Sequence, residues 1–207
     1  MKQQFAFIDT ETTGLQPYTH EVISVAVVYE KDENTGWLSR VMPTRMEAAS
    51  PQAMEINKLV PSSWIDAPTP MDVALKVQSS LKGKTVVGHN VTFDLDFLSA
   101  LCVESKVSPR GSYEDVLGID GFIDTVSLVR EHLFPLGLTS ASLDSVREFL
   151  GWSMEGAHTA RKDAEDVRRL FFLLERMNLL ERQGVKRKVK IALSKRISEA
   201  KDAQSTH

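Results

Sequence analysis

The sequence predicts an α/β fold, a mixed β-sheet of about five strands flanked by α-helices. Three strand-like segments come before the first long helical segment, and two further strand-like segments are each followed by a helix. Strands that alternate with helices are typical of a layered α/β domain, and three strands in succession imply antiparallel neighbours. We therefore expect a mixed sheet and not a purely parallel one.

The predicted strands are short runs rich in valine, isoleucine and phenylalanine. They are Phe5–Asp9, Glu21–Glu30, Gly36–Met42, Thr85–Gly88 and Gly121–Asp124. Residues 43–70 contain five prolines, which predict irregular structure with one helical turn around Met54–Leu59.

The predicted helices carry apolar residues three and four positions apart. They are Pro70–Leu81, Val91–Glu104, Thr125–Leu133, Leu143–Leu150 and Thr159–Leu180. Asn90 directly precedes the second of these helices and is expected to cap it. The last helix is expected to place Leu170, Leu173, Leu174 and Met177 against the core.

The composition is that of a globular protein, with 207 residues of which 42% are hydrophobic and 26% charged. No apolar run approaches the roughly 20 residues of a membrane helix, and the first residues do not form a secretory signal. Cys102 is the single cysteine, so no internal disulfide is possible. We expect a protein of a reducing compartment, the cytoplasm.

Two acidic residues, Asp9 and Glu11, follow a buried apolar run. On a strand they point to the same face, with Cα atoms about 6.7 Å apart. Two carboxylates aimed at one point repel each other unless a cation lies between them, and oxygen ligands suit Mg²⁺ or Mn²⁺. Taken alone, the pair also fits two solvated acids in a loop.

Further polar residues follow later elements. Asp94 lies in the first turn of a predicted helix, directly after the strand end Gly88-His89-Asn90. His158 and Asp163 lie at the start of the last predicted helix. Each segment is ambiguous by itself, because an acid at a helix N-terminus is favoured by the helix dipole in any case.

Together these segments resemble the DEDDh 3′→5′ exonucleases, a family that includes the proofreading ε subunit of bacterial DNA polymerase III, RNase T and oligoribonuclease. The first family motif, Asp-x-Glu-Thr-Thr-Gly, is similar to Asp9–Gly14. The second, His-Asn-x-x-Phe-Asp, is similar to His89–Asp94, and the third is similar to the segment from His158 to Asp163-Ala164. The resemblance covers about residues 5–175 and implies a ribonuclease H-like fold.

The resemblance implies a metal-dependent exonuclease. Asp9, Glu11, Asp94 and Asp163 would hold two divalent ions, Mg²⁺ or Mn²⁺, and His158 would be the general base for the attacking water. The substrate would be the 3′ end of single-stranded nucleic acid, with DNA favoured, and the products nucleoside 5′-monophosphates. Proofreading or repair is the expected setting.

The resemblance also implies residues that bind the substrate. The backbone around Thr12 and Thr13 would contact the 3′-terminal nucleotide. Leu15 would then lie between the last bases, although ordinary core packing is the alternative for this side chain. Relatives of the ε subunit often carry His-Gly-Ile where this chain has Ile56-Asn57-Lys58-Leu59, which affects substrate details and not the chemistry.

Three neighbouring acids are expected to lie outside the catalytic set. Asp96 is about 200° around the helix from Asp94. Asp166 is expected to be a solvated or capping acid with at most a supporting role, and Glu165 is expected to face away.

Several alternatives stay open. One is an RNA-trimming or oligoribonucleotide-degrading enzyme, and another is a proofreading subunit whose polymerase or repair partner is a separate chain. From a different class, the chain could be an inactive nucleic-acid-binding or scaffold module, although such a role would not need all four acids.

The charge is unevenly distributed along the chain. The net charge is −3, but residues 182–207 carry eight Lys/Arg and two acids, so residues 1–181 carry −9. We therefore predict an exonuclease domain over residues 1–181 and a basic, partly helical tail. The tail could pack on the domain, contact the nucleic-acid backbone, or dock on a polymerase or other protein.

Overall fold

The computed structural model describes residues 4–30, 35–57 and 64–182. The basic tail beyond Arg182, and Lys58 and Leu59 of the stretch that replaces His-Gly-Ile, lie outside these residues. The described residues form two compact units. We call residues up to Asp124 together with His158–Arg168 the sheet unit, and Thr125–Ala157 together with the chain from Arg169 the helical unit.

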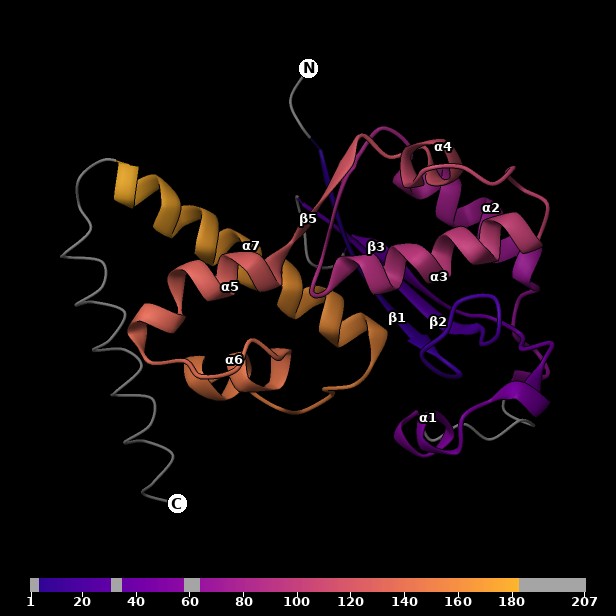
Figure 1. The fold of residues 1–207 in the computed structure, drawn as a ribbon, viewed down its shortest axis with the longest axis horizontal. Coiled ribbons are helices and arrows are strands. Elements are labelled where there is room, and N and C mark those ends of the chain that lie inside the picture. Colours follow the sequence, from indigo (N-terminus) through magenta and orange to yellow (C-terminus); the bar gives the residue numbers. More distant parts are fainter. Residues whose placement is uncertain (1–3, 31–34, 58–63, 183–207) are drawn as a thin grey trace. The chain divides into compact units, whose positions relative to one another are not determined.

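The sheet unit contains a five-stranded mixed sheet (Figure 1), as the sequence predicted. Its strand order is β3 (Gly36–Arg40), β2 (Val22–Tyr29), β1 (Phe5–Thr12), β4 (Thr85–Gly88) and β5 (Gly121–Asp124). β1 and β2 are antiparallel, as are β2 and β3, whereas β4 runs parallel to β1 and β5 parallel to β4. β1 extends three residues beyond its predicted end, because its pairing with β2 continues to Thr12.

The other elements of the sheet unit that the structure delimits are helices, one of them a short 3₁₀ turn. They are η1 (Met46–Ala48), α1 (Pro51–Ile56), α2 (Pro70–Leu81), α3 (Val91–Glu104), α4 (Tyr113–Leu117) and the first part of α7 (Ala160–Arg182). α2 and α3 begin and end at their predicted residues. α4 was not predicted; it begins with a capping box in which Ser112 and Asp115 bond each other's backbone N–H groups.

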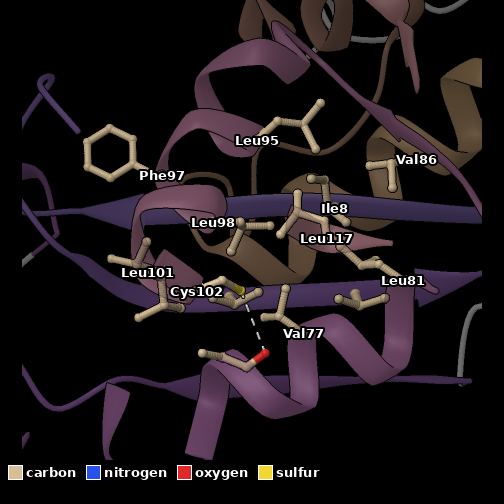
Figure 2. Close-up of a cluster of buried hydrophobic side chains, with 14 of the residues drawn as sticks. Ile8, Val77, Leu81, Val86, Leu95, Phe97, Leu98, Leu101, Cys102 and Leu117 are labelled. Atoms are coloured by element: carbon tan, nitrogen blue, oxygen red, sulfur yellow. Dashed lines mark hydrogen bonds between the residues drawn. The ribbon is translucent and has the colours of Figure 1, made fainter. Parts of the chain in front are cut away.

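The core of the sheet unit lies between the sheet and the helices α2 and α3 (Figure 2). Ile8 from β1 and Val77 from α2 are fully buried there, as is Leu98 from α3. The Cys102 thiol also lies in this cluster and donates to the Ala74 carbonyl oxygen at 3.8 Å. Full burial of one such apolar side chain contributes about 1.5–3 kcal/mol, so this packing fixes α3 against the sheet.

Asn90 occupies the N-cap position of α3, as predicted, but it does not cap the helix with its side chain. Its backbone is left-handed, with φ +66°, and its side chain makes no capping hydrogen bond. Instead, the Asn90 N–H donates to the Asp124 carboxylate at 2.9 Å. The turn between β4 and α3 is therefore anchored to the end of β5.

The helical unit consists of α5 (Thr125–His132), η3 (Phe134–Leu136), α6 (Leu143–Leu150) and the rest of α7. Leu170, Leu174 and Met177 are buried in its apolar cluster, as predicted, while Leu173 is half-buried at its edge. No described helix is long and apolar enough to cross a membrane.

Candidate active site

The candidate site lies at one edge of the sheet. β1, β4 and β5 run parallel, so their carboxyl ends meet at the same edge, where open α/β sheets commonly bind ligands. Glu11 lies at the end of β1, Asp124 ends β5, and Asp94 lies in the first turn of the helix that follows β4. The topology thus brings acids from three separate segments to one edge.

Asp94 is the most deeply buried of these acids. Its side chain is 4% exposed, and the Thr10 hydroxyl donates to its Oδ1 at 2.8 Å. Burial raises its pKa from 3.8 to about 7; hydrogen bonds from Thr10 act in the opposite direction, and the negative charge of Asp124 raises the pKa further. Burial disfavours the charged form of Asp94, so binding of a cation or a proton would stabilise this carboxylate.

The pKa of Glu11 is raised further than that of Asp94. Burial raises its pKa from 4.5 to about 8, and the charges of Asp163 and then Asp94 contribute to the rise. The structure therefore brings Asp163 and Asp94 close enough to Glu11 for their charges to act on it. Among the described residues, no Lys or Arg forms a salt bridge with Glu11.

Asp9 and Asp163 are half-buried. Asp9 lies two residues before Glu11 on the same face of β1. Asp163 lies in the first turn of α7, where its N–H donates to the Thr159 carbonyl oxygen at 3.0 Å. The segment His158–Arg168 belongs to the sheet unit, while the chain on either side of it belongs to the helical unit.

The sheet unit also contains His158, two residues before α7. Its side chain is exposed, and its backbone is left-handed with φ +62°. Few residues other than glycine adopt this conformation, and such positions are often found at functional sites.

The donor set fits hard divalent cations, because all four predicted ligands are carboxylates. The side chains do not yet form a complete coordination site. Across the described residues, no three His, Cys, Asp or Glu side chains lie close enough together to hold an ion. The chemistry of the residues therefore agrees with a metal site whose side chains would have to close around the ions.

The loop after β1 is held by hydrogen bonds within the protein. The Thr13 N–H donates to the Glu21 carbonyl oxygen at 2.8 Å, and its own carbonyl accepts from the Ser50 N–H at 2.7 Å. Gly14 packs so closely on the imidazole of His20 that a Cβ atom there would lie 2.2 Å from its Cδ2. Only glycine fits this position without moving His20.

A pocket of about 480 Å³ opens beside this loop. Its lining comes from the end of β1, the following loop, α1 and the start of α3, and includes Glu11, Thr12, Leu15, Asn57 and Phe93. The Leu15 side chain is 79% exposed, so the alternative that it packs in the core is wrong. Substrate contacts by Thr12, Thr13 and Leu15 stay a prediction.

Two of the three neighbouring acids lie as expected. Asp96 is exposed and accepts from the Tyr113 hydroxyl at 2.6 Å, and Glu165 pairs with Arg161 on the surface of α7. The prediction of a solvated or capping role for Asp166 is wrong: it is 2% exposed and bonded to Lys162 Nζ at 2.6 Å. Helical spacing could not reveal this burial.

Sequence reasoning missed Thr10 and the side chain of Asn57. Thr10 lies between the two acids of β1 and faces the opposite side of the strand, toward Asp94. The alternation of side chains along a strand predicts that Thr10 faces away from Asp9 and Glu11, but it does not predict what Thr10 meets there.

Comparison with known proteins places this chain among nucleases. The RNase_T family model, described as Exonuclease, matches residues 6–171. The chain is 26% identical over 172 residues to the DNA polymerase III subunit epsilon of Treponema pallidum, covering 81% of this chain and 74% of that protein. It is 28% identical over 190 residues to the PolC-type DNA polymerase III of Caldanaerobacter subterraneus, covering 90% of this chain but only 12% of that protein.

Solved structures show the same fold. A zinc-bound form of the E. coli ExoI–ssDNA complex superposes with a TM-score of 0.73 at 19% identity, over 84% of this chain and 41% of that one. The complex of E. coli Exonuclease I with a dT13 oligonucleotide gives a TM-score of 0.72 at 18% identity, again over 84% of this chain and 41% of that one. The predicted fold is confirmed, and since the family model matches about four fifths of its residues, the chain belongs to the exonuclease family.

Proposed function

We propose that this chain is a metal-dependent 3′→5′ exonuclease that removes nucleoside 5′-monophosphates from the ends of single-stranded DNA. One observation carries the proposal: Glu11 lines an open pocket and lies close enough to Asp163 and Asp94 for their negative charges to raise its pKa, in addition to the effect of its burial. Acids arranged in this way destabilise a fold unless a cation or a proton compensates them. The two-metal mechanism is typical of the family.

The four acids lie on three different elements but would share one role, the binding of metal ions. Asp9, Glu11, Asp94 and Asp163 would hold two ions, Mg²⁺ or Mn²⁺. When bound, such ions activate water and stabilise the negative charge that develops on the phosphate. Because the acids come from three different segments, the bound phosphodiester would lie where β1, α3 and α7 meet in the sheet unit.

His158 would accept the proton of the attacking water. Imidazole is suited to this role because it changes charge near neutral pH. The His158 side chain is exposed, which supports this role because the general base has to reach a bound substrate.

The pocket beside Glu11 would take the terminal nucleotide. Its volume of about 480 Å³ suits one nucleotide, and apolar surface from Leu15 and Phe93 can pack against a base whatever its identity. DNA is favoured because the relatives include the epsilon subunit of a DNA polymerase, and because the similar ExoI structures hold DNA oligonucleotides.

A gel time course with 5′-labelled DNA and RNA oligomers in Mg²⁺, Mn²⁺ or EDTA tests the proposal. A ladder that shortens by single nucleotides and disappears with EDTA is the expected result. Internal cuts alone, or cleavage that persists in EDTA, would contradict it. Comparison with an oligomer labelled at the 3′ end fixes the direction, because a 3′→5′ enzyme releases that label in its first step.

An RNA-trimming enzyme is the second candidate. It is supported by 27% identity over 118 residues to the Ribonuclease T of Buchnera aphidicola, covering 48% of this chain and 53% of that protein. The RNA arm of the same time course decides between them, since this candidate requires faster shortening of RNA than of DNA.

A polymerase partner is a further part of the proposal. The epsilon subunit and the PolC-type enzymes are named as DNA polymerase III proteins, and this chain spans only a small share of the PolC-type enzymes. Residues 1–181 would form the exonuclease domain, and the basic residues beyond it would contact a partner or the nucleic-acid backbone.

A further inference from the structure

The nitrogen of the Asn57 side-chain amide is hydrogen-bonded to β1, the strand that carries Asp9 and Glu11. Asn57 ends α1 as its C-terminal cap, and its Nδ2 donates to the Thr12 carbonyl oxygen at 2.9 Å. A carbonyl oxygen can only accept, so this contact fixes which end of the amide is nitrogen. Thr12 directly follows Glu11, so Asn57 is connected to the strand that carries two of the four acids.

The other half of the amide has no partner within the described residues. Asn57 Oδ1 is buried and accepts no hydrogen bond from any described group. Most buried polar atoms in native proteins are hydrogen-bonded, since an unpaired acceptor loses its water without compensation. Asn57 also lines the pocket beside Glu11. An acceptor in this position is therefore suited to a donor on a bound ligand.

The chemistry of a nucleotide narrows the choice of donor. Phosphate oxygens at neutral pH are acceptors, and the donors on the base differ among the four bases. An enzyme that removes every nucleotide in turn needs a contact that does not depend on the base. The hydroxyl of the terminal sugar is the donor that every such end provides.

We propose that Asn57 Oδ1 accepts a hydrogen bond from a sugar hydroxyl of the terminal nucleotide. This inference rests on the proposed function and names the group on the substrate that Asn57 recognises. The Nδ2 contact to Thr12 at the same time sets the distance between the bound sugar and Glu11. Asn57 thus connects recognition of the terminal sugar hydroxyl to β1, the strand that carries Asp9 and Glu11.

The test compares Asn57→Leu, and Asn57→Ala as a second variant, with the unchanged protein on four DNA oligomers. Their last sugar carries a 3′-hydroxyl, a 2′-hydroxyl, both or neither. Binding is measured by fluorescence anisotropy in Ca²⁺, and hydrolysis in Mg²⁺. The unchanged protein should prefer at least one hydroxyl end over the dideoxy end by about tenfold, the scale of a single hydrogen bond. The variants should bind hydroxyl and dideoxy ends equally. The hydroxyl end whose advantage over the dideoxy end disappears in the variants identifies which hydroxyl is bound.

Asn178→Leu is the matched control, because it makes the same chemical change on the surface of α7. Thermal unfolding shows whether each variant is folded. If both Asn57 variants keep the preference of the unchanged protein, or lose affinity equally for all four ends, the inference is overturned. A preference that depends on Asn57 in binding without any hydrolysis would support the inference and instead contradict the proposed reaction.

Discussion

The Thr10 hydroxyl donates a hydrogen bond to Asp94 Oδ1 at 2.8 Å, joining residues 84 positions apart in the sequence. Thr10 lies on β1 between Asp9 and Glu11, and Asp94 lies in the first turn of α3. This bond stabilises the ionised form of a buried acid and opposes the effect of burial on its pKa. It also fixes the start of α3 relative to the strand that carries the other two acids.

Thr10→Val removes this bond with almost no change of shape. A hydrogen bond to a charged group contributes about 1.5–3 kcal/mol, so the affinity for Mg²⁺ or Mn²⁺ at neutral pH should fall about 10- to 100-fold. The pKa of Asp94 should rise, which moves the acid side of the pH–rate profile to higher pH. Thr10→Ser keeps the hydroxyl and should retain most of the affinity, as measured by metal titration; equal affinities for both variants would show that the bond has no such role.

The acids make the metal-free fold sensitive to pH. The pKa of Glu11 rises from 4.5 to about 8 and that of Asp94 from 3.8 to about 7, so the folded state holds protons that the unfolded state has lost. Their contribution to stability is full below about pH 4 and is lost as the pH rises through 7 to 8. In EDTA the melting temperature should fall between pH 5.5 and 8.5, and Mg²⁺ should raise it more at the higher pH.

Glu11→Gln is the control for this pH dependence, because glutamine cannot ionise. In EDTA it should be more stable than the unchanged protein at pH 8.5 and nearly equal to it at pH 5. Parallel melting curves for the two proteins across this range would contradict the assignment of the pH dependence to Glu11.

Asp9→Asn and Asp163→Asn should each lower kcat by about 10³-fold or more, since each removes one charge from a set that would neutralise two divalent ions. The rise in melting temperature caused by Mn²⁺ should shrink in both variants. Asp96→Asn makes the same change two residues from Asp94, at an exposed side chain bonded to Tyr113, and should retain activity. Comparable losses in all three variants would mean that the effect is not specific to the site.

His158→Ala should separate catalysis from metal binding. Loss of a general base costs about 10²- to 10⁴-fold in rate, while the four carboxylates are unchanged. We therefore expect a large fall in kcat together with an unaltered rise in melting temperature on addition of Mn²⁺. Near-normal turnover in this variant would remove His158 from the reaction.

The sequence by itself determined the strands and most of the helices, and it predicted which acids form the site. Alternating and helical apolar patterns are local properties, so α2, α3, β4, β5 and α6 begin and end at their predicted residues. The family motifs are local as well, and they named Asp9, Glu11, Asp94, His158 and Asp163 without any knowledge of the fold.

The tertiary structure alone decided which groups meet across the chain. Contacts between distant segments determine the bond from Thr10 to Asp94, the burial of Asp166 and the exposure of Leu15. They also leave Asn57 Oδ1 without a hydrogen-bond partner among the described residues. The left-handed Asn90, tied to Asp124 at the end of β5, has the same origin. Burial and hydrogen bonding are properties of the neighbours that folding supplies, and a local pattern carries no information about neighbours dozens of residues away.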